Sequence, residues 1–244
     1  MPEWRMERIN EHGLPIGFAL PGWHAPPLPP HATLEGKTCR LEPLQAARHA
    51  RALWEAQAED AEGVRWTYLF NGPFADFAAF EAWIAGLHAS RDPQFYAIVV
   101  DERAAGMAAY MRIEPKHGVI EAGHIYYSPR LAKTRAATEA IYLMLSNAFD
   151  LGYRRFEWKC DSCNLPSRAA ATRFGFTYEG TFRQAIVYKE RNRDTSWFAI
   201  IDVDWRAGLK DAYLRWLDPA NFDADGRQRR KLSALTAPYV HARP

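Results

Sequence analysis

A basic segment at residues 128–137, with the sequence SPRLAKTRAA, has the residue types of an anion-binding helix start. It follows a predicted strand and opens a predicted helix, where the free N–H groups of the first turn and the helix dipole favour a bound anion. Lys133 and Arg135 could add charged hydrogen bonds to phosphate oxygens. The segment has no glycine, however, and a solvated helix start with basic residues is the commoner occurrence of this pattern.

A second polar cluster at residues 161–168, DSCNLPSR, also lies between a predicted strand and a predicted helix. Helices that follow parallel strands begin at the same edge of a sheet, and this edge is where α/β sheets bind ligands. Asn164 and Ser167 are therefore expected to face a ligand. Each of the two residues, taken alone, is more simply explained as a helix cap.

Glu121 is the acidic residue in the predicted strand VIEAGHIYYS at residues 119–128. A carboxylate whose pKa is raised by burial could act as a general base, whereas an exposed carboxylate would only pair with a neighbour. His124 follows three residues later and should face the other side of a regularly pleated strand. We expect it to be a packed, hydrogen-bonded histidine rather than a catalytic one.

The elements that would position these groups alternate along residues 37–205. The predicted strands are residues 37–44, 94–101, 104–114, 118–128, 153–161, 176–189 and 194–205, and the predicted helices are residues 45–60, 75–90, 133–151 and 165–176. Residues 118–161 form a strand–helix–strand unit, which makes a right-handed crossover and a parallel strand pair. The expected fold is α/β (α+β), with a mixed, largely antiparallel sheet, one central parallel strand pair and helices on both faces.

The chain divides into three predicted parts, which are a proline-rich arm at residues 1–36, the domain at residues 37–205 and a helical tail at residues 206–244. Proline at the density of the arm excludes helix and central strand. The tail contains the basic run RQRRK at residues 227–231, which we expect on a solvated helix face.

The amino-acid composition limits which partners and which metal or disulfide sites are expected. The net charge is only +2, so neither nucleic acid nor an anionic membrane is required as a partner, and no apolar run is long enough to cross a bilayer. Three cysteines without an apolar signal sequence predict reduced thiols in the cytoplasm. Cys160 and Cys163 form a C-x-x-C pair, but no second pair follows at ligand spacing, so no metal site is predicted.

These clusters, in this order, resemble the GNAT acetyltransferase superfamily and, more closely, its RimJ/RimL type. The motifs that carry the resemblance are Thr-Glu-Ala at residues 138–140, Asn-x-x-Ser at 164–167, Gly-Phe-x-x-Glu-Gly at 175–180 and Arg-Asp at 193–194. The matching segments run over residues 121–205, and the resemblance extends with weaker support back to residue 37.

The resemblance implies acetyl-CoA as the acetyl donor. In the family, backbone amides of an Arg/Gln-x-x-Gly-x-Gly/Ala loop hold the pyrophosphate, and alignment through Thr138 places that loop at residues 132–137. This chain has Ala132 for the usual Arg or Gln and Arg135 for the first Gly, so a cation is available where the family has bare backbone. The implied cofactor contacts are Tyr126, Lys133, Arg135, Ala136, Ala137, Thr138, Asn164 and Ser167.

The resemblance also implies catalytic groups. Glu121 matches the glutamate that acts as base in histone-type members, and the backbone N–H of Ile125 would stabilise the oxyanion where this strand bulges in the family. No tyrosine lies at residues 164–175 to serve as general acid, which leaves Ser167 or a water near the thioester sulfur. The thioester is already activated, so no metal is needed.

The leading interpretation is an N-acetyltransferase that acts on a primary amine, either a protein N-terminus, an amino acid or a small amine. The alternative is a non-catalytic acyl-CoA-binding sensor, which Arg135 in the loop and the missing tyrosine support. The aromatic segments at residues 65–74 and 197–201 would either surround the acceptor or belong to the core. The sequence leaves open whether the chain is a monomer or a homodimer.

Overall fold

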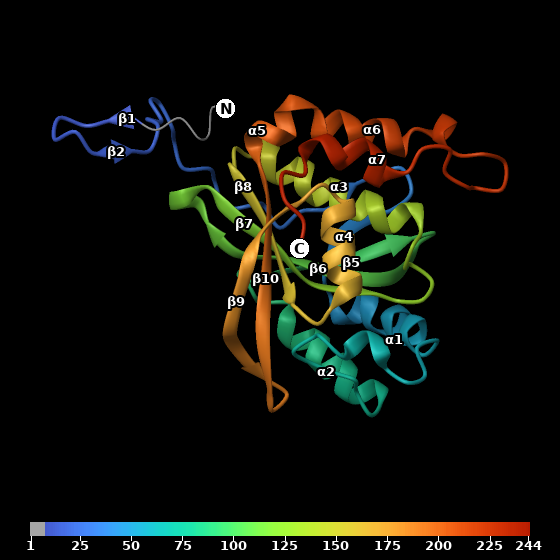
Figure 1. The fold of residues 1–244 in the computed structure, drawn as a ribbon. Coiled ribbons are helices and arrows are strands. Elements are labelled where there is room, and N and C mark those ends of the chain that lie inside the picture. The colour runs from blue at the N-terminus through green and yellow to red at the C-terminus, as the bar shows by residue number, and fades with distance from the viewer. Residues whose placement is uncertain (1–7) are drawn as a thin grey trace.

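The computed structural model describes residues 8–244, so residues 1–7 of the predicted arm lie outside the described residues. The fold is organised by an 8-stranded sheet in the order β3-β4-β5-β6-β7-β8-β10-β9 (Figure 1). Its strands are β3 (Leu34–Glu35), β4 (Arg40–Pro43), β5 (Gln94–Val100), β6 (Arg103–Glu114), β7 (Val119–Tyr127), β8 (Arg155–Asp161), β9 (Thr177–Tyr188) and β10 (Arg191–Ile201). Neighbouring strands are antiparallel except β7 and β8, which are parallel. The predicted mixed sheet with one central parallel pair is therefore confirmed.

Helices cover the sheet on both faces, as predicted (Figure 1). The helices are α1 (Arg51–Gln57), α2 (Phe77–Leu87), α3 (Arg135–Asp150), α4 (Leu165–Arg173), α5 (Asp202–Asp204), α6 (Lys210–Leu217) and α7 (Leu232–Thr236). One core cluster joins α1 and α2 to strands β5 and β6, and the other joins α3, α4, α6 and α7 to the opposite face of the sheet. The two faces of the sheet therefore pack against two separate cores.

The alternation of side chains along a strand sorts residues between these two cores. In β6, Ala108 and Tyr110 belong to the cluster that contains α3, whereas Met107 and Ala109 belong to the cluster of α1 and α2. The β7 residue Glu121 pairs with Met111, two residues beyond Ala109, and so faces the α1–α2 side. The predicted acid therefore lies away from α3.

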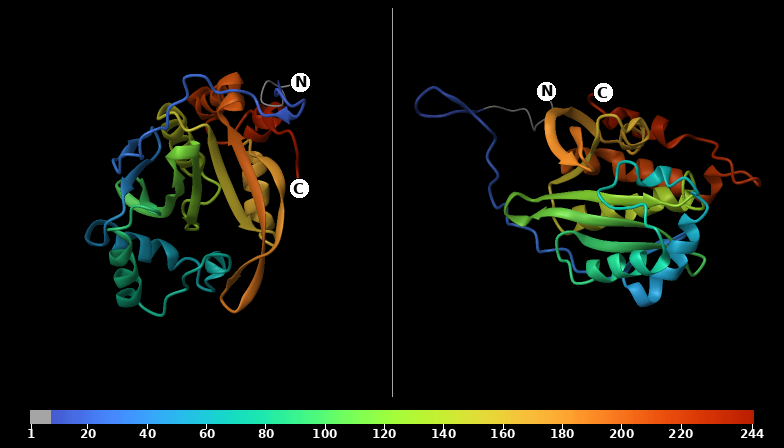
Figure 2. Two further views of the ribbon diagram at one scale, coloured as in Figure 1. Left: turned by 90° about the vertical axis from the view of Figure 1, so that its left-hand side faces the viewer. Right: turned by 90° about the horizontal axis from the view of Figure 1, so that it is seen from below.

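The arm and the tail lie outside the sheet. The strands β1 (Arg8–Ile9) and β2 (Pro15–Ile16) form a short hairpin that projects from the body (Figures 1 and 2). The helices α6 and α7 of the tail pack beside α3 and α4. Within residues 8–244, no helix is both long and apolar enough to cross a membrane.

The prediction of a helix face for the basic run at residues 227–231 is wrong. Helix α7 begins only at Leu232, and the run lies in an irregular loop with one isolated bridge between Phe222 and Gln228. The side chain of Asn221 holds this loop, because its amide donates to the Trp216 carbonyl and its oxygen accepts from the Arg230 N–H. Such side-chain bonds give a backbone an alternative to helix.

Candidate active site

The parallel strands β7 and β8 separate part-way along their length. They pair from Val119 opposite Arg155 to Ala122 opposite Trp158, and the pairing ends there although both strands continue. Backbone N–H and C=O groups beyond that point need other partners. The opening between the two strands is thus a place where a ligand can bond to backbone.

A bulge lies in β7 at the point where the strands separate. Gly123 pairs with Ala109 and Tyr126 pairs with Met107, so His124 and Ile125 together oppose one residue of β6. The backbone of His124 is left-handed, with φ at 49°. A bulge occurs at the place that the resemblance implied for Ile125.

The bulge also changes the direction of His124. A regular pleat would put His124 on the face opposite Glu121, but its ring lies 5.0 Å from that of Phe95, which belongs to the α1–α2 core. The extra residue in the bulge reverses the alternation, so His124 and Glu121 share a face. The expectation that they lie on opposite faces is wrong.

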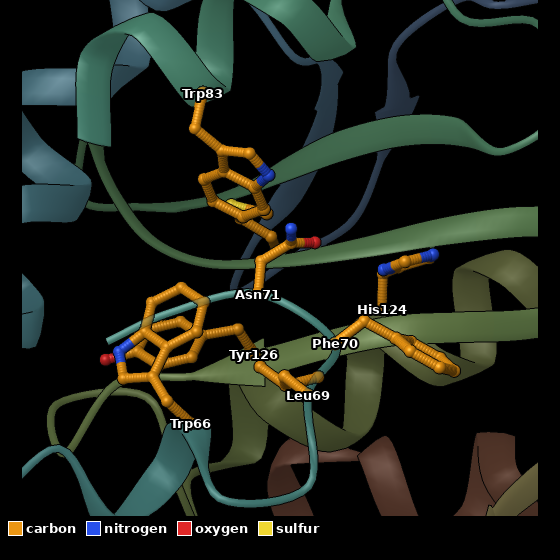
Figure 3. Close-up of a pocket in the computed structure, with 8 residues that line it drawn as sticks. Trp66, Leu69, Phe70, Asn71, Trp83, His124 and Tyr126 are labelled. Carbon is orange, nitrogen blue, oxygen red and sulfur yellow. The ribbon is translucent and has the colours of Figure 1, made fainter. Parts of the chain in front are cut away.

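The His124 ring is not hydrogen-bonded to any of residues 8–244, contrary to the expectation of a bonded core histidine. Neither ring nitrogen is among the buried atoms that lack a partner, so both nitrogens reach solvent. Burial of the ring lowers the pKa of His124, which keeps the imidazole neutral and able to accept a proton. The ring lines a small hollow (Figure 3).

Aromatic side chains from the segment between α1 and α2 form this hollow. Trp66 stacks on Tyr126 with their ring centres 4.5 Å apart, and Phe70 lies near His124 (Figure 3). The Phe70 ring also contacts the Tyr188 ring, with centres 5.6 Å apart. The hollow encloses about 10 Å³, which is room for about one water molecule. The Tyr126 ring thus faces the α1–α2 side, away from α3, and its contact with the cofactor stays a prediction.

The hairpin of β9 and β10 closes the hollow from the other side of the face. Lys189 at its turn donates to the carbonyls of Trp66 and Gly72, each at 2.8 Å, and Arg191 donates to the carbonyl of Thr67 at 3.1 Å. Figure 2 shows the tip of this hairpin, in orange, reaching the segment between α1 and α2. The aromatic segment is therefore fixed by hydrogen bonds to the hairpin.

Glu121 lies in a buried ion pair. Its carboxylate is 2.8 Å from Lys159 Nζ and 3.1 Å from Arg112 Nε, and the side chains of Glu121 and Lys159 are each 4% exposed. Lys159 also lies 2.6 Å from Glu157 and 3.8 Å above the Trp197 ring. Burial raises the pKa of Glu121, and the Lys159 charge opposes that rise. The acid is buried, as a raised pKa requires, but its carboxylate is already paired.

The start of α3 has unsatisfied backbone groups, as the basic segment predicts. The Thr134 hydroxyl caps the helix by accepting from the Ala137 N–H at 3.1 Å, while the N–H groups of Arg135 and Ala136 have no intrahelical partner. Lys133, not Arg135, has the left-handed backbone, with φ at 65°. The absence of glycine at position 135 therefore causes no strain, because that residue is already helical.

The Arg135 side chain does not extend over the amides of this turn. Its guanidinium donates to the Leu217 carbonyl and lies 4.6 Å from the centre of the Phe222 ring. The Thr138 hydroxyl, one turn further along α3, accepts from both terminal nitrogens of Arg173 at 3.1 and 3.2 Å. The tail thus determines where Arg135 points, which the loop sequence alone did not indicate.

Asn164 and Ser167 both hold the start of α4. The Asn164 side-chain oxygen accepts from the Ser167 N–H at 3.1 Å, and Ser167 Oγ accepts from the Trp158 indole at 3.0 Å. The capping interpretation is thus observed for Asn164. The Asn164 NH₂ group stays available to a ligand, because it donates to no part of the chain that the structure describes, whereas the Ser167 hydroxyl also bonds to the Cys160 thiol.

Comparison with known proteins decides the family. A family model described as "Acetyltransferase (GNAT) domain" matches residues 39–177. The chain belongs to the GNAT acetyltransferase family. A GCN5-related N-acetyltransferase from Brucella melitensis is 46% identical, with a TM-score of 0.87 over 89% of this chain and 100% of that chain. A probable GNAT-family acetyltransferase from Chromobacterium violaceum is 45% identical, with a TM-score of 0.74 over 79% of this chain and 98% of that one.

More distant structures show the same fold. An acetyltransferase from Salmonella typhimurium, described as modifying the N-terminal serine of ribosomal protein L7/L12, has a TM-score of 0.60 at 21% identity over 69% of this chain and 98% of that chain. No curated protein matches the sequence. The GNAT assignment makes this chain an acetyl-CoA-dependent acyltransferase.

Two cationic side chains of this GNAT domain, Lys159 and Arg173, were not predicted from the sequence. Lys159 reaches Glu121 only because the register of β7 and β8 puts Glu157, two residues before it, opposite Glu121. The alternation of Glu157 and Lys159 along one strand was a signal in the sequence. Arg173 reaches Thr138 through the packing of α4 on α3, for which the sequence has no local signal. Among residues 8–244, no cluster of three potential metal ligands occurs.

Proposed function

We propose that the protein is an N-acetyltransferase of the RimJ/RimL type that moves the acetyl group of acetyl-CoA to a primary amine. The observation that carries this proposal is the bulge at His124 and Ile125, which lies where β7 and β8 separate. It brings a backbone donor and a neutral imidazole together beside the opening between the strands. The Asn-x-x-Ser and Gly-Phe-x-x-Glu-Gly motifs support the RimJ/RimL type.

The cofactor would bind along the edge where α3 and α4 begin. We assign the pyrophosphate to the N–H groups of Arg135 and Ala136, with the exposed Lys133 beside them. The Ala137 N–H is left out because the Thr134 hydroxyl already accepts it. The Asn164 NH₂ would bond the pantetheine arm, and the arm would run from there into the opening between β7 and β8.

Acetyl transfer requires attack by a neutral amine, stabilisation of the oxyanion and departure of the thiolate. The amine nitrogen forms a bond to the thioester carbon while the Ile125 N–H donates to the carbonyl oxygen. The carbon–sulfur bond then breaks, and the Ser167 hydroxyl donates its proton to the thiolate and regains one from solvent. The amine proton passes to the His124 imidazole.

We assign the base to His124 rather than to Glu121 because of their surroundings. Glu121 is 4% exposed and its carboxylate is held by Lys159 and Arg112, so an amine has no direct path to it. Burial favours the neutral form of His124 by lowering its pKa, the ring bonds to none of residues 8–244, and it lies beside Ile125 on the same bulge. Glu121 then has an electrostatic role, since it neutralises Lys159 beneath the cleft.

The acceptor would enter between the aromatic segment and the β9–β10 hairpin. Trp66, Phe70 and Tyr126 offer ring surfaces that suit an apolar group next to the reacting amine. Because the hollow holds about one water, Phe70 must move to admit a substrate. A peptide with a free N-terminus, an amino acid and a small aromatic amine all fit this description.

The test is thiol release from acetyl-CoA against a panel of N-terminal peptides, amino acids and small amines, with CoA affinity measured by calorimetry. We expect CoA binding together with turnover on at least one amine class, and a rate that rises with pH as the amine deprotonates. Tight binding without turnover on the whole panel would favour the non-catalytic acyl-CoA sensor. Absence of CoA binding would reject both functions.

A further inference from the structure

Arg193 is a buried cation in β10 to which the mechanism assigns no task. Only 7% of its surface is exposed. The Nε of Arg193 donates to Thr195 Oγ1 at 3.2 Å, and the side chain forms no other hydrogen bond and no ion pair with residues 8–244. A charge that is removed from water without an anionic partner costs the fold free energy. A ligand that supplies an anion would offset this cost.

The carboxylates on the neighbouring parts of the sheet bond to other donors. Asp161 accepts from the Tyr188 hydroxyl at 2.8 Å, and Asp194 accepts from the Gln184 N–H at 2.7 Å. Neither acid forms an ion pair with Arg193. The two nearby acids are therefore held by neutral groups, and the charge of Arg193 stays unpaired within the part of the chain that the structure describes.

The guanidinium of Arg193 lies on the face of the sheet where the acceptor is proposed to enter. Its central carbon is 5.5 Å from the centre of the Phe70 ring, and the same ring lies 6.3 Å from the His124 ring (Figure 3). The two terminal nitrogens are unbonded but are not among the buried atoms that lack a partner, so both reach solvent. Arg193 thus has free donors one aromatic ring away from the proposed base.

We propose that Arg193 binds a carboxylate of the acceptor, and that the acceptor is a free amino acid. This assignment rests on the proposed function, in which an amine is acetylated beside His124. A guanidinium offers parallel N–H groups that match the two oxygens of a carboxylate. With its amine at His124 and its carboxylate at Arg193, an amino acid would lie across the present position of Phe70. This is the ring that has to move to admit a substrate.

The surroundings of this site favour a small molecule over a peptide. The aromatic segment is bonded to the hairpin through Lys189 and Arg191, and on its other side the Tyr68 hydroxyl donates to the Cys163 carbonyl at 3.1 Å. A peptide chain needs an open groove, whereas a small molecule can be enclosed beneath a segment that is held at both sides. An uncharged amine would also fit in size, but it would leave Arg193 without an anion.

The test compares amino acids with their amides as acceptors. Leucine and phenylalanine share their amine and side chain with leucinamide and phenylalaninamide, which lack the carboxylate. The wild type should acetylate the acids with a kcat/KM about tenfold or more above that of the amides, as expected for a charged hydrogen-bonded pair. The amide is the weaker base and its amine is more often neutral, so this chemical difference acts against the expected preference.

Three substitutions assign the preference to Arg193. Arg193→Met should abolish it by raising KM for the acids, and should leave kcat/KM for the amides unchanged. Arg193→Lys keeps the charge but lacks the parallel N–H groups, so it should restore part of the preference. Arg183→Met is the matched control, because Arg183 is exposed on β9 of the same hairpin, and it should behave as the wild type does.

The possible outcomes separate this assignment from the proposed function. Equal losses on acids and amides in Arg193→Met would show that Arg193 is only structural, and a fall in its melting temperature would accompany them. A wild type that acetylates uncharged amines or N-terminal peptides as well as it acetylates amino acids would overturn the assignment and leave the proposed function intact. A wild type that binds CoA but acetylates no amine would instead reject the proposed function.

Discussion

Glu121→Gln is the substitution whose consequence follows most directly from the structure. It removes a negative charge with little change of shape and leaves Lys159 with Glu157 and the Trp197 ring as partners. Removing one member of a buried ion pair costs about 3–5 kcal/mol when the remaining charge is left alone. Glu157 stays 2.6 Å from Lys159 Nζ, and burial raises the pKa of Glu121, so the fold favours the neutral acid over the carboxylate. Because glutamine resembles the neutral acid, we expect Glu121→Gln to lose less than about 1 kcal/mol in the free energy of unfolding at neutral pH.

Lys159→Met should destabilise the fold more than Glu121→Gln does. It would leave Glu121 and Glu157, which are opposite each other in the parallel register, as two buried carboxylates without the cation between them. The double variant should be more stable than the sum of the two single losses predicts, by about 1–3 kcal/mol. Urea denaturation of the four proteins measures this coupling. A milder loss in Lys159→Met than in Glu121→Gln would refute the buried ion pair.

The pH dependence of these variants has a definite sign. Burial raises the pKa of Glu121 above its ordinary value of 4.5, so the folded state holds that proton more tightly than the unfolded chain does. Ionisation of this group therefore weakens the fold as pH rises through the interval between the two values. The Lys159 charge opposes the rise in the pKa of Glu121, so Lys159→Met should widen the interval. This variant should therefore lose stability more steeply than the wild type as the pH rises above 4.5.

Activity of Glu121→Gln distinguishes the two candidate bases. With His124 as base, the variant should keep its CoA affinity and lose less than about tenfold in turnover on the best acceptor of the panel. A loss of about 10²–10⁴-fold that higher pH partly restores would identify Glu121 as the base instead.

Substitutions at three further residues test the other assignments. His124→Gln should lower turnover by about 10²-fold or more near neutral pH and regain part of it at high pH, where the amine arrives deprotonated; an unchanged pH profile would exclude His124. Asn164→Asp keeps the oxygen that caps α4 but lacks the NH₂ donor. Its melting temperature should therefore equal that of the wild type, while calorimetry should show weaker binding of CoA. Asn164→Ala should bind CoA more weakly and should also lose about 1 kcal/mol in the free energy of unfolding, because the cap is removed. Lys189→Met removes two hydrogen bonds to the aromatic segment and should speed amide exchange at residues 66–72 while that of α3 stays unchanged; equal exchange would show that the hairpin does not hold the segment.

The order of strands and helices could be predicted because each element carries its own hydrophobic period and turn residues. The start of α3 could be predicted for the same reason, since a polar turn between a strand and an amphipathic helix is a local sequence pattern. The direction in which the Arg135 side chain points could not be predicted, because it depends on where Leu217 and Phe222 of the tail pack. Helical patterns predicted that the tail has helices but carry no information on which surface they cover.

The prediction of which sheet face His124 occupies was wrong because of a single backbone irregularity. Alternation along β7 holds as far as Gly123 and fails at the bulge, whose position depends on pairing with β6 and not on the residues of β7 alone. Only the family resemblance indicated a bulge there. A rule based on period two must therefore misplace every residue that follows such a bulge.

Left-handed backbone at non-glycine residues gives a last, independent indication of the site. Such residues cost roughly 1–2 kcal/mol each and persist where the surroundings enforce them. Among residues 8–244 there are eight such residues, and four of them lie in hairpin turns, as Asp101 and Lys189 do, where the turn itself requires the conformation. Arg112 and Gln184 lie at irregularities of strand pairing, as His124 does, and Lys133 precedes α3. Glycine would relieve the strain at His124 and Lys133, which agrees with the proposal that the reaction uses the imidazole and the phosphates use the ammonium.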